Sequence, residues 1–148
     1  QENRAFVGQH TIETTTDPAV MQVYADRELL DIALLNLLDN ACKYSAPDSV
    51  IRIAAAHKPG FVGISVSDHG VGVAPEHQEE IFDEYFRIPS SEGSRGSGLG
   101  LPFVKNIVNN HQGHVELISQ PGQGSTFTMW FPAPSDVSPH SEINTKPI

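Results

Sequence analysis

Two pairs of alternating segments, each joined by a tight turn, limit the possible folds more than any other feature of this sequence. Apolar residues alternate with polar or small ones over residues 51–55 and 62–66, and a Lys-Pro-Gly turn at 58–60 lies between them. A second pair covers residues 115–117 and 127–131, with PGQG in between. Both pairs predict β-hairpins, so the chain does not follow the strict strand-helix alternation of a parallel α/β fold.

Helical periodicity occupies much of the remaining sequence. A helix is predicted over about residues 27–45, because apolar residues recur there at helical spacing after Asp26, a suitable N-cap. A short helix is predicted over about 75–81. Another is predicted over about 99–111, where Pro102 is tolerated because it lies in the first turn.

Residues 10–15 and 20–25 are candidates for additional short strands. Because hairpins and helices are mixed, the expected fold class is α+β, a two-layer α/β sandwich. In it, about three helices cover one face of a mixed, mostly antiparallel sheet. Residues 1–133 are expected to form one domain, with a polar, Pro- and Ser-rich tail or linker over residues 134–148.

Charge and cysteine content argue against several functions. The net charge is −9 with only nine Lys and Arg residues, which argues against general affinity for nucleic acid or anionic lipid. Cys42 is the only cysteine, so no disulfide forms within the chain. No apolar run approaches the roughly 20 residues that span a bilayer. Because the chain starts at Gln1, we expect it to be a piece of a longer protein.

The helix at 27–45 carries polar side chains that need an explanation. Asn36, Asn40 and Lys43 occupy positions i, i+4 and i+7 and therefore share one face beside the leucines. Asparagine is a mediocre helix former, but its amide oxygen suits magnesium, an ion that keeps several waters and shares phosphate oxygens. The alternative is an ordinary solvated helix face.

Two glycine-containing motifs lie at strand ends. DHGVG, residues 68–72, directly follows the strand at 62–66, so the Asp68 carboxylate can accept hydrogen bonds, for example from an exocyclic amine, while the glycines allow a planar ring to approach. GQGSTF, residues 122–127, lies in the last hairpin, where Thr126 can add a hydroxyl to a pocket. Each motif alone also fits a plain tight turn.

A third region combines aromatic residues with a glycine-rich loop. IFDEYFR, residues 81–87, precedes a loop without periodicity over residues 88–98. Gly96, Gly98 and Gly100 then lead directly into the next helix, where backbone N–H groups and the helix dipole can receive an anion such as phosphate. The aromatic residues are equally compatible with a plain core role.

The joint occurrence of these motifs, in this order over residues 36–126, is more specific than any one of them. In this combination the sequence resembles the ATP-binding catalytic domain of sensor histidine kinases. That family shares a wider group with DNA gyrase, the ninety-kilodalton heat-shock chaperones and the mismatch-repair ATPases. The resemblance covers about Ala25 to Pro132 and implies a Bergerat-type ATP-binding fold.

The resemblance also implies roles for individual residues. Asp68 would take the adenine amino group, Asn40 would hold Mg²⁺, and Arg87 or Arg95 could reach the γ-phosphate from a mobile lid over about residues 87–98. The implied nucleotide-binding residues are Asn36, Asn40, Lys43, Tyr44, Asp68, Gly70, Gly72, Val73, Arg87, Gly96, Ser97, Gly98, Leu99, Gly100, Leu101 and Thr126. Departures from the family pattern are few: Tyr85 in the aromatic box, Pro102, and Gln112 in place of the customary glycine.

Asn36 distinguishes a kinase from an ATPase within this group. The resemblance to the related ATPases implies that Asn36 stands where those proteins have a glutamate that activates water. An amide cannot take a proton near neutral pH and so cannot replace that glutamate as a base. The acceptor would instead be a histidine on a separate helical dimerisation domain. None of the seven histidines here has the expected helical context with a following acidic residue, so none is expected to be that acceptor.

The expected activity is therefore an ATP-dependent protein histidine kinase of two-component signalling, in a cytoplasmic fragment that lacks its acceptor histidine. Expected partners are MgATP, the dimerisation domain of the parent protein and the receiver domain of a response regulator. Two alternatives stay open: a serine kinase of the anti-sigma type, which shares the pocket, and an interaction module that binds no nucleotide.

Overall fold

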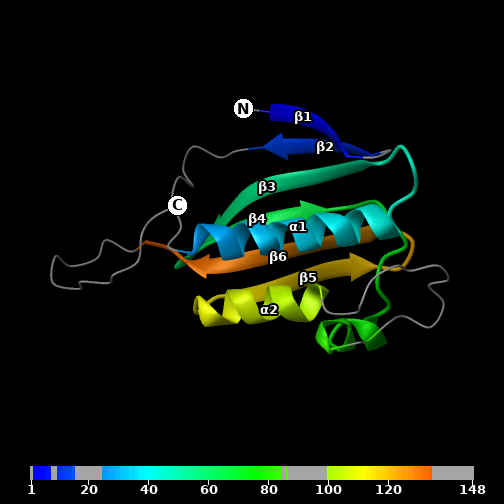
Figure 1. Cartoon of the computed structure of the whole chain (residues 1–148). Coiled ribbons are helices and arrows are strands. Elements are labelled where there is room, and N and C mark those ends of the chain that lie inside the picture. Colours follow the sequence, from blue (N-terminus) through cyan, green and yellow to red (C-terminus); the bar gives the residue numbers. More distant parts are fainter. Residues whose placement is uncertain (1, 8–9, 16–24, 85, 87–99, 135–148) are drawn as a thin grey trace, which may run out of the picture.

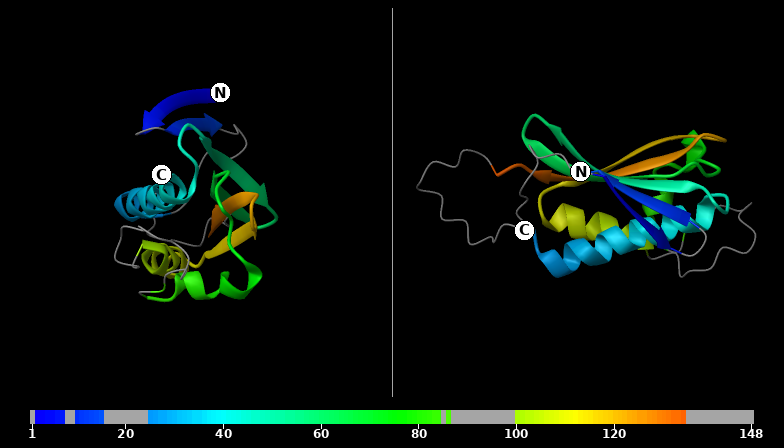
Figure 2. Two further views of the ribbon diagram at one scale, coloured as in Figure 1. Left: turned by 90° about the vertical axis from the view of Figure 1, so that its right-hand side faces the viewer. Right: turned by 90° about the horizontal axis from the view of Figure 1, so that it is seen from above.

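A single mixed sheet carries helices on one face, as the computed structural model of the chain shows (Figures 1 and 2). The structure describes residues 2–7, 10–15, 25–84, 86 and 100–134. Its strands are β1 (Glu2–Val7), β2 (His10–Thr15), β3 (Val50–Lys58), β4 (Phe61–Ser67), β5 (His114–Gln120) and β6 (Gly124–Pro132). The helices are α1 (Arg27–Tyr44) and α2 (Gly100–Asn110), with two short 3₁₀ turns, η1 (Pro75–His77) and η2 (Glu80–Phe82).

The six strands lie in the order β1-β2-β3-β4-β6-β5. All neighbouring pairs are antiparallel except β2 and β3, which run parallel because α1 forms the crossover between them. Both predicted hairpins, β3–β4 and β5–β6, are present. The predicted fold class, a mixed and mostly antiparallel sheet in an α+β sandwich, is confirmed.

Helix α1 begins where the sequence predicts. The Asp26 side chain accepts a hydrogen bond from the Leu29 N–H at 3.1 Å, which satisfies one of the free donors of the first turn. The helix ends at Tyr44, followed by Ser45 in an extended conformation. Its buried side chains pack on the sheet and on α2, in one core with β4 and β6. The α1 residues of that core are Leu30, Ala33, Leu37 and Ala41.

Three local predictions differ from the structure. The helix predicted over residues 75–81 forms as the separate 3₁₀ turns η1 and η2, because a turn at Gln78 and Glu79 interrupts it. Strand β1 was not predicted and forms by pairing with β2. Of the strand candidate at 20–25, residues 20–24 lie outside the described residues, and Ala25 is a bend rather than part of a strand.

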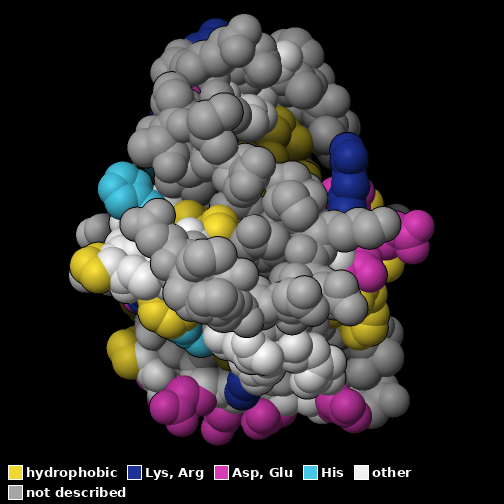
Figure 3. Space-filling view, turned by 90° about the vertical axis from the view of Figure 1, so that its left-hand side faces the viewer, with side chains coloured by type: hydrophobic (Ala, Val, Ile, Leu, Met, Phe, Trp, Pro, Cys, Tyr) yellow, Lys and Arg dark blue, Asp and Glu magenta, His cyan; other side chains and the backbone are white. Residues whose placement is uncertain are grey.

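The described part of the chain contains no helix that is long and apolar enough to cross a membrane. At the end of the molecule seen in Figure 3, Asp and Glu side chains are prominent along the lower rim and one side, whereas Lys and Arg are sparse among the coloured side chains. This distribution agrees with the net charge of −9.

Candidate nucleotide-binding site

Asp68 lies immediately after β4 and is only 7% exposed. Its Oδ1 accepts hydrogen bonds from the Gly70 N–H at 2.8 Å and the Ser125 N–H at 3.2 Å, while its own N–H donates to the Ser125 carbonyl at 2.8 Å. Among the described residues, no donor reaches Oδ2. The carboxylate is therefore held in place through one oxygen, and the other is left to accept a hydrogen bond from a ligand.

Burial raises the pKa of Asp68 above its ordinary range, and the backbone hydrogen bonds from Gly70 and Ser125 and the charge of His69 offset this only in part. Desolvation disfavours the charged form of a carboxyl group, whereas a hydrogen-bond donor stabilises that charged form. A ligand amine that donates to Oδ2 would thus favour ionisation of Asp68. Ligand binding and proton release at this residue are expected to be coupled.

The turn after Asp68 leaves no room for side chains. A Cβ on Gly70 would overlap the Tyr44 carbonyl, and one on Gly72 would overlap the Gln120 carbonyl. Gly72 also has a φ of +72°, a conformation that favours glycine. These glycines let the turn contact both the end of α1 and the β5–β6 hairpin. The plain turn interpretation of the motif therefore holds, and the turn also positions Asp68.

Polar residues not predicted from the sequence hold the next part of the turn. The Ser119 hydroxyl accepts a hydrogen bond from the Val73 N–H at 2.8 Å. The Gln78 side-chain amide donates to the Val73 and Ser119 carbonyls at 3.1 and 3.2 Å. Ser119 continues the apolar alternation of Val115 and Leu117, and a polar residue at such a position is a signal that could have identified it.

Asn36 faces the start of α2. Its side-chain Nδ2 donates to the Ile32 carbonyl at 3.0 Å, and its Oδ1 lies 3.2 Å from the position that a Cβ on Gly100 would occupy. Gly100 is the first residue of α2, whose first-turn N–H groups have no acceptor within the helix. The structure therefore brings the Asn36 amide to the helix N-terminus that the sequence predicts to receive phosphate.

Helix α1 connects this helix terminus with the Asp68 turn. Asn36, Asn40 and Tyr44 follow one another at intervals of four residues and so lie along one side of α1. The eight steps from Asn36 to Tyr44 cover about 12 Å along the axis. Asn40 and Tyr44 are half-buried. Lys43, which helical geometry places on the same side, forms an ion pair with Asp39 at 3.3 Å.

The remaining predicted site residues fall into two groups. Thr126 lies on β6 opposite Ser67, with its hydroxyl 2.9 Å from the Ser67 hydroxyl, directly beside the strand end that carries Asp68. Leu101 is half-buried in the first turn of α2. The other predicted residues lie outside the described residues, namely Arg87, Arg95, Gly96, Ser97, Gly98 and Leu99, as does Tyr85 of the aromatic box.

Comparison with known proteins assigns the family. The family described as "Histidine kinase-, DNA gyrase B-, and HSP90-like ATPase" matches residues 25–135. The sensor-like histidine kinase SenX3 of Mycobacterium tuberculosis is 43% identical over 125 residues, which cover 82% of this chain and 30% of SenX3. The sensor histidine kinase ZraS of Escherichia coli is 39% identical over 118 residues, covering 80% of this chain and 24% of ZraS.

Solved structures agree with this assignment. The mycobacterial sensor histidine kinase MprB superimposes with a TM-score of 0.71 at 30% identity, covering 84% of this chain and 82% of that structure. Full-length ShkA in complex with AMPPNP gives a TM-score of 0.67 at 31% identity, covering 82% of this chain and 25% of that one. The chain spans less than a third of SenX3 and ZraS. It belongs to the histidine kinase-, DNA gyrase B- and HSP90-like ATPases, as the catalytic ATP-binding domain of a sensor histidine kinase.

Proposed function

We propose that this domain binds MgATP and donates its γ-phosphate to a histidine on a separate dimerisation domain of the parent kinase. The observation that carries the proposal is the Asp68 carboxylate, buried and fixed through Oδ1, with Oδ2 left for a donor. An exocyclic amine such as that of adenine supplies such a donor. Gly70, Gly72 and Val73 would lie beside the ring, and Thr126 would add a hydroxyl at the same end.

The polyphosphate would extend from the Asp68 turn along α1 toward the N-terminus of α2. Support comes from the line of Asn36, Asn40 and Tyr44, and from the position of the Asn36 amide oxygen, 3.2 Å from where a Cβ on Gly100 would lie. Backbone N–H groups of Gly100 and Leu101 would then meet phosphate oxygens. Lys43 would approach the nucleotide only after leaving Asp39.

Asn40 would be the protein ligand of Mg²⁺. Within the described ranges, no group of three or more His, Cys, Asp or Glu side chains is arranged to hold a metal ion. A single amide oxygen such as that of Asn40 suits magnesium bound with its nucleotide, because Mg²⁺ takes most of its ligands from water and phosphate and needs few from the protein. Bound there, the ion would neutralise phosphate charge.

In the proposed reaction the acceptor histidine nitrogen attacks the γ-phosphorus. The bond between the γ-phosphorus and the oxygen that bridges the β- and γ-phosphates breaks, and ADP leaves. Asn36 is an amide and cannot deprotonate water, so transfer to the histidine is favoured over hydrolysis. Arg87 or Arg95 would stabilise the charge of the transferred phosphoryl group. The histidine-bearing domain, a response-regulator receiver domain and a cytoplasmic location belong to the same proposal.

Calorimetric titration of MgATP into the chain, into Asp68→Asn and into Asp31→Asn tests nucleotide binding. Asp31 is an exposed carboxylate on α1 and serves as the matched control. Saturable binding by the parent chain and by Asp31→Asn, with a large loss for Asp68→Asn, supports the proposal. Absence of binding by the parent chain would indicate a nucleotide-independent module. Phosphorylation of serine rather than histidine in a partner would indicate the anti-sigma class.

A further inference from the structure

Strand β5 forms one edge of the sheet, and its backbone polarity can be derived from its neighbours. Ser125 on β6 directs its N–H and C=O to Asp68, on the β4 side. Its β5 partner, Ser119, therefore faces away from β6, and its carbonyl accepts from the Gln78 amide at 3.2 Å. Because this orientation alternates along an antiparallel strand, Val115 and Leu117 also direct their N–H and C=O groups outward.

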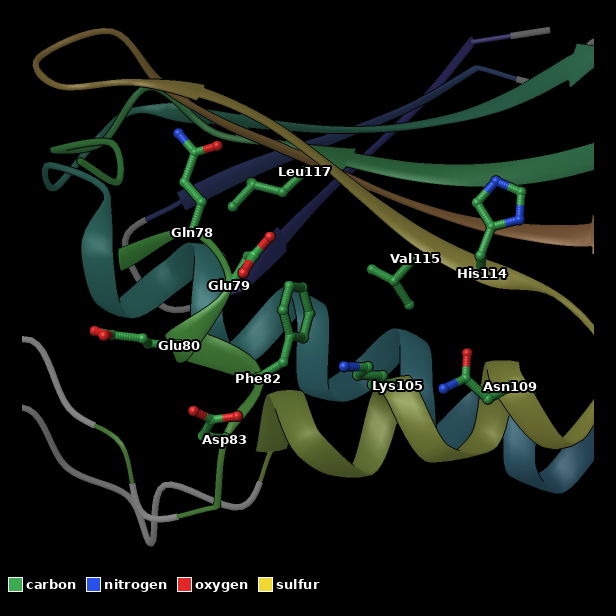
Figure 4. Close-up of a pocket in the computed structure, with 10 residues that line it drawn as sticks. All are labelled: Gln78, Glu79, Glu80, Phe82, Asp83, Lys105, Asn109, His114, Val115 and Leu117. Carbon is green, nitrogen blue, oxygen red and sulfur yellow. The ribbon is translucent and has the colours of Figure 1, made fainter. Parts of the chain in front are cut away.

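A cavity of about 630 Å³ lies beside this edge. Val115 and Leu117 line it from β5, while Lys105 and Asn109 line it from α2, with the Lys105 amino group toward Phe82 (Figure 4). Phe82 of η2 contributes an aromatic face to the lining. The cavity contains none of the residues predicted to bind nucleotide. It is a groove in which Val115, Leu117 and Phe82 lie beside a sheet edge that pairs with no further strand among the described residues.

The groove has an excess of acidic side chains. Glu79, Glu80 and Asp83 line its η2 side and are exposed, whereas Lys105 is the one Lys or Arg among the described lining residues. The Lys105 ammonium lies 5.8 Å from the Phe82 ring centroid, a cation–π distance. Within the described residues, neither Glu79 nor Asp83 forms an ion pair. Their charges are therefore available to a partner with Lys or Arg side chains.

We propose that this groove binds an extended, basic peptide segment of a partner protein, which adds to the sheet beside β5. The outward N–H and C=O groups of Val115 and Leu117 would pair with its backbone, and Phe82 would contact its apolar side chains. Alternate side chains of the segment would reach Glu79 and Asp83. The hydrogen bond from Gln78 to the Ser119 carbonyl blocks the end of β5 from Ser119 onward. About five residues of β5, roughly 17 Å, are therefore open to pairing.

The probe is the peptide acetyl-Lys-Val-Lys-Val-Lys-Val-amide, added to the chain with amide hydrogen exchange followed by NMR. Two control peptides have the same length: one carries Glu in place of Lys, and one is N-methylated at alternate residues and so lacks half of its backbone donors. We expect the probe to slow exchange of the Val115 and Leu117 amides by about tenfold at saturation. Neither control peptide is expected to do so.

Paired protein variants separate charge recognition from nonspecific attraction. The double variant Glu79→Gln/Asp83→Asn should weaken probe binding by about fivefold. Glu116→Gln, which removes a charge from β5 on the other face of the sheet, should change it by less than about twofold. Because the groove contains none of the proposed nucleotide ligands, MgATP titration of these variants is expected to match the parent chain.

Three results would overturn the proposal. The first is probe binding without protection of the Val115 and Leu117 amides. The second is equal binding of the N-methylated peptide. The third is protection of the same amides in the chain alone as its concentration rises, which would assign this edge to a second copy of the chain.

Discussion

Replacing Asp68 with Asn tests the adenine contact with little disturbance of the fold. The two hydrogen bonds from Gly70 and Ser125 both go to Oδ1, and the side-chain oxygen of asparagine can accept both. What changes is the other position, where an NH₂ group replaces Oδ2. A donor would then face the donor of the adenine amine, so the variant loses one charge-assisted hydrogen bond and leaves a donor unpaired.

The expected loss follows from that single contact. Hydrogen bonds to charged groups contribute about 1.5–3 kcal/mol, and the unpaired donor adds to the cost. Taking about 2–3 kcal/mol in total, the Kd for MgATP should rise by about 30- to 150-fold. Calorimetry measures the Kd, and thermal unfolding without nucleotide reports the fold. An unchanged Kd in a variant that unfolds like the parent chain would refute the role of Asp68.

Three further predictions concern the structure around the site. Gly72→Ala should destabilise the chain more than Gly60→Ala in urea unfolding. Both glycines have positive φ, but of the two only at Gly72 would the added Cβ meet backbone atoms, those of Gln120. We therefore expect about 1 kcal/mol of strain at Gly60 and clearly more at Gly72. Asp26→Ala should cost about 1 kcal/mol of unfolding free energy, since it removes the N-cap of α1. Because the pKa of Asp68 is raised in the native state, the native chain holds more protons than the unfolded chain at pH values between the ordinary pKa of 3.8 and the native pKa. The free energy of unfolding should therefore fall as pH rises through that window, whereas MgATP affinity should fall as pH is lowered through it. Both trends should be smaller in Asp68→Asn.

Local patterns were sufficient to predict the elements whose side chains alternate or repeat most regularly. Helix α1 was predicted because a capping residue and a periodic apolar stripe coincide, and both hairpins because alternating segments flank short turns. These signals arise from residues near one another in sequence. Burial against the rest of the fold then reinforces them.

Elements that depend on distant partners were less predictable. Strand β1 depends on pairing with β2, and the parallel pairing of β2 with β3 depends on the α1 crossover. The segment at 75–81 was predicted as one helix, but its backbone forms two separate 3₁₀ turns, and the Gln78 side chain is held by the Val73 and Ser119 carbonyls. Tertiary contacts of this kind override local propensity.

In the candidate site, too, some residues could be predicted from local sequence and others depend on distant partners. Asp68 and the Asn36–Asn40 face were singled out because asparagine is unusual inside a helix and because their motifs occur together in the order typical of the family. The residues that hold Asp68 and Val73 were not, since Ser125 and Ser119 are far away in sequence and resemble ordinary strand residues. Their roles depend on the register of the β5–β6 hairpin.

The most direct test of the central claim is phosphoryl transfer from ATP labelled at the γ-phosphate, with Mg²⁺. The chain is incubated alone and together with the histidine-bearing dimerisation domain of its parent kinase. We predict acid-labile label on a histidine of that domain, none on the chain alone, and a strong reduction with Asp68→Asn. Acid-labile label on the isolated chain, or acid-stable label on serine of the partner, would contradict the account.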